Sequence, residues 1–388
     1  MENKVMRLAR TAVRRGLAEP DTPLVGMRNN TTVWNRNDSR IPELEKALSL
    51  LAVNSLFFGI PKEPYRTIVN TFTELYENTI NPTDWESRVY FHDIPIVPHF
   101  SAVRIAGALT KHKAALIAGE GIITVDTVDP EKAYVYYSSV CFAFFVKFFV
   151  DYLSELRTSI RPSIPPHIFE RVCSFLPPEI SGQWVLEQGP FSEPETVYPA
   201  IKEVGKLTVD NGLVDSVQGN ISYVLDKMIH ITRSGAPLDK LDGCIVACPV
   251  EGSSPAIACA SSELPVHRAI VQNTHYRAIL HSHPKFPVIL SMDCNRHGCH
   301  PSDTCYTGCP YKRYIGTTPV VSGEGGAGEH SISKTVPPAI TGQSGVIIYG
   351  HGLITVGEDD FTLPFNKLVE IENFCRNEYF RKVARAYE

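Results

Sequence analysis

The sequence predicts an α/β protein in which one fold occurs twice along the chain. Short apolar, strand-like runs alternate with helical patterns, a proline-rich stretch divides the chain, and fragments before that stretch recur in order after it. With 388 residues, the chain is long enough for two domains that each bury a core. We expect residues 1–160 to form the first domain, 161–197 a proline-rich connector and 198–388 the second domain.

The composition is that of an ordinary soluble protein. Hydrophobic residues make up 43% and charged residues 20% of the chain, and the net charge is −5. This charge gives no electrostatic reason to expect nucleic acid or an anionic membrane as a partner. The N-terminus has no signal-peptide pattern, and the apolar run 140–150 is short for a membrane span and contains Lys147. We therefore expect a cytoplasmic protein that binds a small molecule.

The elements of the first half follow from apolar spacing. The patterns predict, in order, a helix at 5–17, a helix beginning at 42, a strand at 56–58, a helix at 101–110, strands at 114–118 and 122–125, and a long aromatic helix from 130 to 156. Asp129 and Pro130 mark the start of the long helix.

The second half alternates strands and helices in the same way. After the connector, which could contain a short helix at 168–175, the patterns predict a helix at 198–211, a strand after the turn at 218–220, strands at 244–250 and 256–260, a helix at 261–274, a strand at 278–283, a helix at 284–290, strands at 346–349 and 353–356, and a helix at 364–386.

Two histidines stand two positions apart at the end of an apolar run. If this run is a strand, His281 and His283 point to the same face, a few ångströms apart. Two imidazoles on one face are half of a tetrahedral metal site, and a catalytic zinc takes three protein ligands and keeps a fourth position open. The alternative is a strand end with two solvated histidines.

The internal repeat is the most informative feature of the sequence. GEGIITV at 119–125 matches GHGLITV at 350–356, 231 residues later, and each copy follows an apolar strand and precedes a long helix. SRIP at 39–42 matches SELP at 262–265, and FGIPKEP at 58–64 matches HSHPKFP at 281–287, both 223 residues later. The second copy therefore holds eight extra residues between the two sets of matches, in the interval that contains a cysteine-rich loop.

The repeat shows that candidate functional residues are present in only one copy. Three candidate metal ligands and one candidate acid/base are replaced in the first copy, where Phe58 stands opposite His281, Ile60 opposite His283, Glu120 opposite His351 and Arg40 opposite Glu263. The prolines and glycines around them are retained. We therefore expect the first copy to keep the fold and to lack the site.

With these motifs, residues 198–388 resemble the class II aldolase/adducin family. The resemblance consists of a Gly-Asn turn, an Ile-Thr-x-Ser-Gly turn, Ser-Ser-Glu at the head of a helix, His-x-His on a strand and a later His-Gly. It implies an α/β/α sandwich around a mainly antiparallel sheet, so that the whole chain would be a class II aldolase-like fold in tandem duplication. The first domain would be a degenerate, N-terminally shortened copy.

The resemblance also implies roles for individual residues. His281, His283 and His351 would bind a divalent metal, most often Zn2+, and Glu263 would be the catalytic acid/base. The implied pocket for a substrate phosphate consists of Asn220, Ser234, Gly235, Ser261 and Ser262. In one departure from the family, Val217 stands where family aldolases often carry Thr or Ser, and this weakens the inference of a phosphate.

These assignments have structural alternatives. Ser261 and Ser262 could only cap the following helix, and Glu263 could be a first-turn carboxylate that the helix dipole favours. Asn220 and Gly235 could simply occupy turn positions. Function is favoured because all these residues occur together in one copy, while the other copy loses four candidates together.

Four cysteines form a second cluster in the loop 294–310, which has no counterpart in the family. Cys294, Cys299, Cys305 and Cys309, with His297 and His300 between them, could hold a second, structural zinc or, less readily, an iron–sulfur cluster. Their spacings fit no standard zinc motif, and redox-paired thiols are the alternative.

The sequence as a whole predicts a zinc-dependent, aldolase-type carbon–carbon lyase. Three neutral imidazoles leave the metal its charge and an open position to polarise a ketone and stabilise an enediolate, while Glu263 moves a proton. The expected substrate is a small sugar or keto compound that carries a phosphate. A dehydratase or epimerase with the same site and a non-catalytic, adducin-like scaffold protein are the alternatives. Family active sites lie between subunits of a fourfold ring, which a homodimer of tandem chains would reproduce with pseudo-fourfold symmetry.

Overall fold

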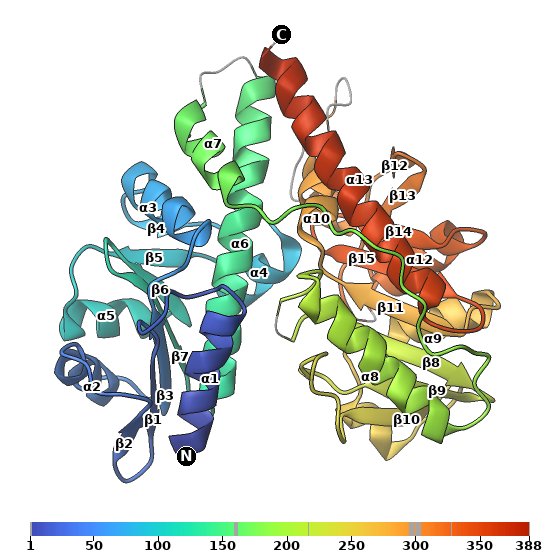
Figure 1. Cartoon of the computed structure of the whole chain (residues 1–388), viewed down its shortest axis with the longest axis horizontal. Helices are drawn as coiled ribbons and strands as arrows, with labels where there is room; N and C mark the ends of the chain where they lie inside the picture. Colours follow the sequence, from blue (N-terminus) through green and yellow to red (C-terminus); the bar gives the residue numbers. More distant parts are fainter. Residues whose placement is uncertain are drawn as a thin grey trace. The chain divides into compact units, whose positions relative to one another are not determined.

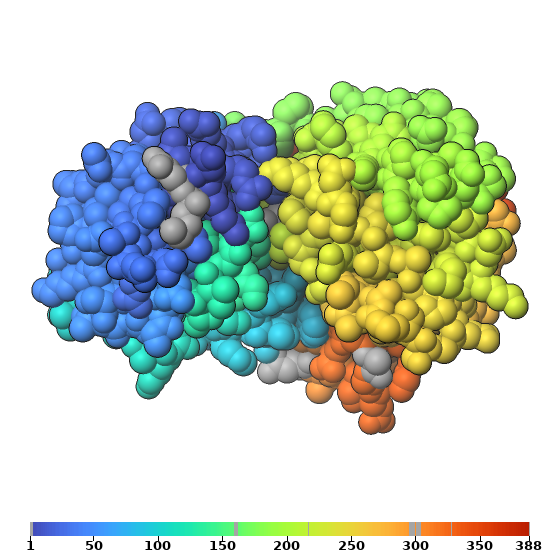
Figure 2. All heavy atoms as spheres, turned by 90° about the horizontal axis from the view of Figure 1, so that it is seen from below, coloured from blue at the N-terminus to red at the C-terminus, as the bar shows by residue number. Residues whose placement is uncertain are grey.

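The chain folds into two α/β units, Met1–Pro177 and Pro178–Glu388, each built on one sheet (Figure 1). The computed structural model describes residues 2–158, 162–215, 217–294, 299, 304–326 and 328–387. The division at Pro177 falls inside the proline-rich segment 161–197. In Figure 2 the colours run from blue to green over the first unit and from green through yellow to red over the second.

The first unit has a seven-stranded sheet in the order β2-β1-β3-β7-β6-β5-β4. Its strands are β1 (Leu24–Arg28), β2 (Thr32–Trp34), β3 (Ser55–Gly59), β4 (Thr79–Ile80), β5 (Ile94–Val97), β6 (Ala114–Ile117) and β7 (Gly121–Asp126). Its helices are α1 (Glu2–Arg14), α2 (Ile41–Ser49), α3 (Tyr65–Leu75), α4 (Trp85–Phe91), α5 (Ala102–Leu109), α6 (Pro130–Arg157) and α7 (Pro166–Ser174). Neighbouring strands are antiparallel except β5 and β6, which are parallel.

Helices cover both faces of this sheet, and its central strands carry apolar side chains that pack against each helical layer. Leu56 and Phe58 pack with α2 and α5 on one face. Phe57, between them, points to the other face and contacts Tyr134 and Tyr137 of α6 at ring-centroid distances of 5.7 and 4.7 Å. Consecutive apolar residues such as Leu56, Phe57 and Phe58 are the pattern of a strand that is buried between two helical layers.

Helix α6 is long and apolar enough to cross a membrane by length and composition alone. However, 83% of its most apolar 18-residue stretch is buried inside the protein. Core helices of soluble proteins have the same character. The helix begins as the sequence predicts, with Pro130 in its first turn and the Asp129 carboxylate accepting a hydrogen bond from the Glu131 amide.

The second unit has an eight-stranded sheet in the order β10-β9-β8-β11-β15-β14-β13-β12. Its strands are β8 (Asn220–Leu225), β9 (Met228–Thr232), β10 (Ile245–Pro249), β11 (Ala278–Ser282), β12 (Arg313–Ile315), β13 (Thr318–Val321), β14 (Gly345–Ile348) and β15 (Gly352–Gly357). Its helices are α8 (Pro194–Asp210), α9 (Leu264–Asn273), α10 (Lys285–Met292), α11 (Thr304–Thr307), α12 (Ile332–Ile340) and α13 (Thr362–Tyr387), with the 3₁₀ helix η1 (Pro255–Cys259). Helices α9 and α12 share one core with the sheet, and α10 and α13 pack against each other, with α13 also contacting β15.

The two sheets pair their strands in the same order and register. Strands β2-β1-β3-β7-β6-β5-β4 of the first correspond to β9-β8-β11-β15-β14-β13-β12 of the second, and each has one parallel pair, at β5–β6 and β13–β14. Phe58 pairs with Ile123 as His281 pairs with Ile354, which is the alignment of the sequence repeat. Both sheets are mixed and mainly antiparallel, as expected.

One predicted strand is wrong. Residues 256–259 belong to η1 and not to a strand, and Ala260 forms only an isolated bridge with Arg233. Pro255 stands at the first position of this helix and cannot donate a ladder hydrogen bond, and the Ser254 hydroxyl accepts a bond from the Ala256 amide at 3.3 Å. The apolar side chains therefore lie on a helical turn.

The segment after the division is bound along α13. Backbone amides of Ile180, Trp184 and Leu186 donate to side chains of that helix, namely Asn373 (3.1 Å), Asn366 (3.1 Å) and Thr362 (3.2 Å). Proline-rich chain that cannot form a ladder thus has its backbone groups satisfied by side chains. This part of the expected connector is integral to the second unit.

Candidate metal centre

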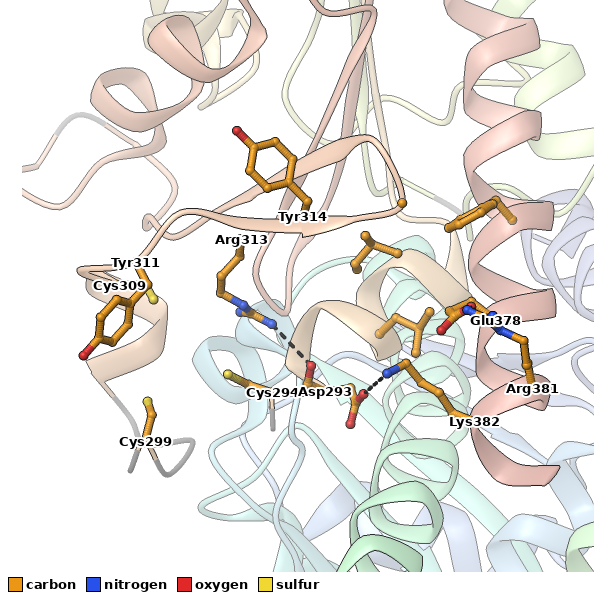
Figure 3. Close-up of a pocket in the computed structure, with 14 residues that line it drawn as sticks. Asp293, Cys294, Cys299, Cys309, Tyr311, Arg313, Tyr314, Glu378, Arg381 and Lys382 are labelled. Carbon is orange, nitrogen blue, oxygen red and sulfur yellow. Dashed lines mark hydrogen bonds and ion pairs between the residues drawn. The ribbon is translucent and has the colours of Figure 1, made fainter. Parts of the chain in front are cut away.

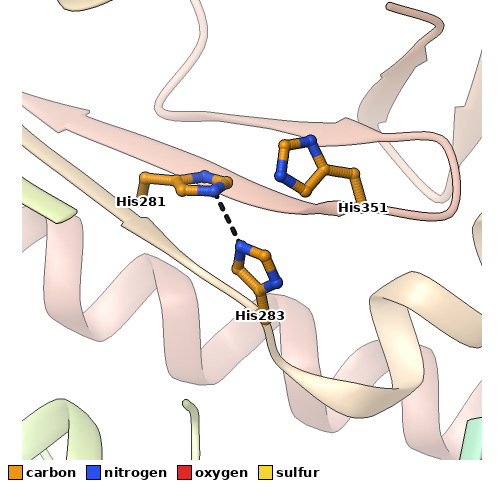
Figure 4. A group of neighbouring side chains, drawn as sticks. All are labelled: His281, His283 and His351. Carbon is orange, nitrogen blue, oxygen red and sulfur yellow. Dashed lines mark hydrogen bonds between the residues drawn. The ribbon is translucent and has the colours of Figure 1, made fainter. Parts of the chain in front are cut away.

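Three histidines from the end of one strand and from a turn of the second sheet converge at one point (Figure 4). His281 lies on β11, His283 directly follows that strand, and His351 lies in the turn between β14 and β15. The ligand atoms that the three can offer all lie within 4.8 Å of one another. The Nε2 atoms of His281 and His283 are 3.0 Å apart, and all three side chains are at most 4% exposed.

The glycines on both sides of His351 make this approach possible. Gly350 has a φ of +60°, in the left-handed region that favours glycine. A Cβ atom on Gly352 would lie 2.6 Å from the Ser282 carbonyl oxygen and 2.9 Å from the His281 ring. The motif Gly-His-Gly therefore has a steric cause: the turn brings β15 against the histidines, and no side chain fits there.

Glu263 completes the cluster. It stands at the N-cap position of α9, 7% exposed, with Oε2 3.3 Å from His281 Nε2 and Oε1 3.4 Å from His351 Nε2. Burial alone would raise its pKa, but the imidazoles of His281 and His351 and the Asn220 amide outweigh this effect and lower the pKa to about 2. The side chain is thus a carboxylate that can accept a proton.

The donor set fits a divalent metal ion. Burial lowers the pKa of His283 to about 4, so that its imidazole is neutral, the form that binds metals. Three imidazole nitrogens with one open position is the donor set of catalytic zinc sites such as that of carbonic anhydrase. The structure therefore brings together the four residues that the sequence singled out. The close approach of His351 depends on the glycines on either side of it.

Four of the five residues expected to bind a phosphate lie on two adjoining turns. The Ser234 amide donates to the Cys259 carbonyl at 3.1 Å, and the Ser261 amide donates to the Thr232 carbonyl at 3.0 Å. These bonds place Ser234 and Gly235 against Ser261 and Ser262, next to Glu263. Ser234, Gly235 and Ser262 are exposed, so the paired turns form a solvent-accessible rim beside the buried cluster.

Ser261 and Asn220 already have partners within the protein. The Ser261 hydroxyl accepts a hydrogen bond from the Glu263 amide at 3.3 Å, within the turn before α9. The N-cap of α9 is Glu263, so Ser261 does not cap this helix as its structural alternative expected. Asn220 is 4% exposed, and its Nδ2 donates to Glu263 Oε2 at 2.9 Å. Asn220 is therefore in contact with the acid/base candidate.

Three further residues near the site were not identified from the sequence. His267 and Ser222 are fully buried and extend the hydrogen bonds of Asn220. Gln218 is 5% exposed, and neither polar atom of its side chain has a hydrogen-bond partner in the described part of the chain. His267 could have been found, because it lies four residues after Glu263 and therefore on the same face of α9.

The cysteine cluster lines a different place in the second unit. Cys294, Cys299 and Cys309 border a cavity of about 450 Å³ together with Asp293 and Arg313 (Figure 3). Among the described residues, the three histidines form the one group of three or more metal-ligating side chains. His297 and His300 lie outside the described residues. The second metal or redox cluster stays a prediction.

The comparisons with known proteins concern the second half of the chain. Residues 200–379 match the family model described as the class II aldolase and adducin N-terminal domain. No curated protein sequence matches the chain.

Several solved structures are similar to about half of the chain. The crystal structure of L-fuculose-1-phosphate aldolase from Thermus thermophilus is 24% identical, with 48% of this chain and 95% of that chain covered and a TM-score of 0.39. YgbL from Klebsiella pneumoniae is 21% identical, with 47% and 87% covered and a TM-score of 0.38. The sugar-phosphate aldolase from Thermotoga maritima is 19% identical, with 47% and 93% covered and a TM-score of 0.34.

Proposed function

Because residues 200–379 match the family model of the class II aldolase and adducin N-terminal domain, we propose that the second unit is a metal-dependent, aldolase-type carbon–carbon lyase. One observation carries the proposal: three buried imidazoles and one buried carboxylate meet, with Glu263 3.3 Å from His281 and 3.4 Å from His351. A structural histidine cluster has no need of an ionised carboxylate enclosed beside it, since burying that charge is costly.

His281, His283 and His351 would hold the metal, and zinc is the ion that this set of ligands favours. Bound there, a divalent ion supplies a Lewis acid that polarises a carbonyl oxygen and stabilises the negative charge developing on it. Burial keeps the His283 ring neutral, and all three rings are at most 4% exposed, so bulk water is largely excluded from the ligand side. We expect a substrate to approach from the side of Glu263 and of the paired turns, where Ser234, Gly235 and Ser262 are exposed.

Glu263 would carry the proton. In the cleavage direction, the bond between the α and β carbons breaks, the β-hydroxyl loses its proton and becomes a carbonyl, and the electron pair remains on the α carbon. That carbon then takes up a proton. A carboxylate that accepts the hydroxyl proton and returns it to carbon balances the reaction with no oxidant or reductant.

The rim formed by Ser234, Gly235, Ser261 and Ser262 is the proposed position of the remote end of the substrate. Hydroxyls and backbone amides at turns bind anionic oxygens well, so a phosphate of a small sugar or keto compound suits this rim. The first-turn amides of α9 contribute little, since those of Leu264 and Val266 already donate to chain carbonyls.

The first unit would be the degenerate copy of a tandem duplication. Its sheet repeats the strand order and register of the second, while Phe58 and Arg40 occupy the positions of His281 and Glu263. We propose that two chains assemble as a homodimer with pseudo-fourfold symmetry in the cytoplasm. Light scattering that gives the mass of a monomer or a trimer would contradict this assembly.

The decisive experiment is a metal analysis of the purified full chain followed by a screen of sugar phosphates and aldehydes. We expect about one zinc per chain and cleavage of a phosphorylated substrate, both lost in His281→Ala. Conversion without a change in carbon number would indicate a dehydratase or epimerase. A chain without a divalent metal would exclude the enzyme and favour a scaffold protein of the adducin type.

A further inference from the structure

A chain of buried hydrogen bonds runs across the second unit to Glu263. Ser222 Oγ lies 2.6 Å from His267 Nδ1, His267 Nε2 lies 2.6 Å from Asn220 Oδ1, and Asn220 Nδ2 lies 2.9 Å from Glu263 Oε2. Ser222 and Asn220 lie on β8, His267 lies on α9 and Glu263 at the N-cap of that helix, and none is more than 7% exposed. Such a network has few alternative partners and holds its members in place.

The direction of each hydrogen bond follows from the last member. The Asn220 Nδ2 donates to Glu263 Oε2, so the Asn220 Oδ1 faces His267. An amide oxygen only accepts, and His267 must therefore carry its proton on Nε2. Burial lowers the pKa of His267 to about 3, so the ring is neutral, its Nδ1 is an acceptor, and the Ser222 hydroxyl donates to it. Every donor in the chain points toward Glu263.

The first unit shows that the fold does not require this network. By strand register and the repeat, Asn220 corresponds to Leu24, Ser222 to Gly26 and His267 to Leu44. Leu24 and Leu44 are fully buried in one apolar core with Phe58. The polar chain and the metal ligands are thus absent together from one unit and present together in the other, although the backbone is the same.

We propose that His267 is a positioning residue for Glu263, acting through Asn220 with its tautomer fixed by Ser222. This inference rests on the proposed function. Asn220 holds Oε2 of Glu263 as an acceptor in every step, and a proton that Glu263 takes up is therefore confined to Oε1, the atom that faces His351. Without the hydrogen bond from Asn220, the carboxylate of Glu263 would rotate, and either of its oxygens could carry the proton.

The first test uses activity. We compare the metal-loaded full chain with His267→Leu, the residue of the first unit, and His267→Gln, whose Nε2 can still donate to Asn220. The probe is exchange of carbon-bound hydrogen of dihydroxyacetone phosphate with deuterated water. We expect kcat to fall about 10- to 100-fold in His267→Leu with KM changed less than about threefold, and recovery to within about fivefold of wild type in His267→Gln. Equal loss in both variants, or none in either, would overturn the proposal.

The second test does not depend on turnover. The side-chain carboxyl 13C resonance of Glu263, assigned with Glu263→Gln, reports its hydrogen bonds, and 15N spectra of the histidine rings report the tautomers. We expect the 13C chemical shift of Glu263 to change in His267→Leu and to remain that of wild type in His267→Gln. In the 15N spectra of wild type, we expect His267 to carry its proton on Nε2 only. An unmoved Glu263 resonance in His267→Leu, or a proton on Nδ1, would overturn the proposal. If wild type exchanges no proton while these spectra behave as expected, the proposed reaction fails and the positioning of Glu263 stands.

Discussion

Equivalent positions of the two sheets hold different groups. In the second unit they hold three histidines and a glutamate, and in the first they hold an ion pair between an arginine and a glutamate. In the second unit, Glu263 lies 3.3 and 3.4 Å from two imidazoles. At the equivalent place in the first unit, the Arg40 guanidinium lies 5.1 Å above the Phe58 ring and 4.0 Å from the Glu120 carboxylate. The positions of the side chains are thus fixed by strand register, whereas the chemistry depends only on which residues occupy them.

The two places also differ in their access to water. The Glu120 side chain is 44% exposed, whereas that of Glu263 is 9% exposed. Arg40 is held from outside the sheet by Asp38, whose carboxylate accepts bonds from Arg40 Nε at 2.8 Å and Nη2 at 3.1 Å. Water screens the attraction between exposed charges. The charged groups of the first unit therefore interact weakly, whereas the buried carboxylate of Glu263 interacts with the imidazoles beside it with little screening.

The largest effect is expected when His281 of the second unit is replaced by phenylalanine, the residue at the equivalent position of the first unit. In His281→Phe, the metal loses one of three ligands, and we expect metal affinity and turnover to fall by more than about 100-fold, beyond the loss caused by changing a residue that only supports a ligand. Metal content by mass spectrometry after dialysis and the activity screen measure this. The control is the reverse exchange, Phe58→His, which adds a single histidine and should leave the metal content unchanged.

The opposite experiment restores the missing residues. The quadruple variant R40E/F58H/I60H/E120H places the four polar residues on the first sheet. Without metal, we expect the first unit to lose about 3 kcal/mol of stability, because apolar contacts of buried Phe58 are replaced by a polar ring. With zinc, we expect one additional ion per chain and recovery of the melting temperature. A native circular dichroism spectrum with unchanged metal content would show that register alone does not define the site.

A smaller difference concerns the long helices. Burial raises the pKa of Glu372 on α13 to about 7, against the hydrogen bond from the Phe286 amide and the charges of Lys285 and Arg376. The equivalent residue of α6 is Cys141. Folded Glu372 thus keeps its proton up to about pH 7, whereas the unfolded chain loses it near pH 4.5, so the folded state binds more protons between these values.

The free energy of unfolding of the second unit should therefore decrease as pH rises from about 4.5 to 7. Since Glu372 is only partly buried, we expect about 1–2 kcal/mol from it. Hydrogen exchange of α13 amides at several pH values measures this, and Glu372→Gln should flatten the dependence. An equal slope in that variant would assign the effect to other groups.

The smallest expected effect is that of Arg40→Met. The variant removes the ion pairs with Asp38 and Glu120 and the contact with the Phe58 ring. Together these contribute about 1 kcal/mol or less at this partly exposed position. Denaturant unfolding measures the change, and metal content and turnover should equal those of wild type. A loss of turnover would mean that the first unit contributes to catalysis.

The repeat made the centre of each sheet predictable from the sequence. It aligned β3, β6 and β7 with β11, β14 and β15, because buried central strands read as continuous apolar runs. Edge strands such as β2, β4 and β12 are short and partly exposed, and their residues show no such run. Helix α12 was also missed, since Pro337 and Pro338 in its last turn indicate a loop.

Within the site, the ligands were predictable and their support was not. His281, His283 and His351 stand in motifs, and their absence from the first copy marks them. The contact of Asn220 with His267 joins residues 47 positions apart on different elements, and only the packing of α9 against the sheet reveals it. Ser222 looks like any polar residue of a half-buried strand, and its role depends on the tautomer of a ring on another element.

The paired glycines around His351 have a consequence for the interpretation of sequence motifs. Gly121 in the first unit has a φ of +148°, and a Cβ there would lie 2.4 Å from the Gly59 carbonyl oxygen, so that unit needs its glycines as much as the second does. A search pattern that scores the glycines would accept both halves of this chain as enzymes. Only the residue between them, Glu120 or His351, separates a turn that closes a sheet from one that delivers a ligand.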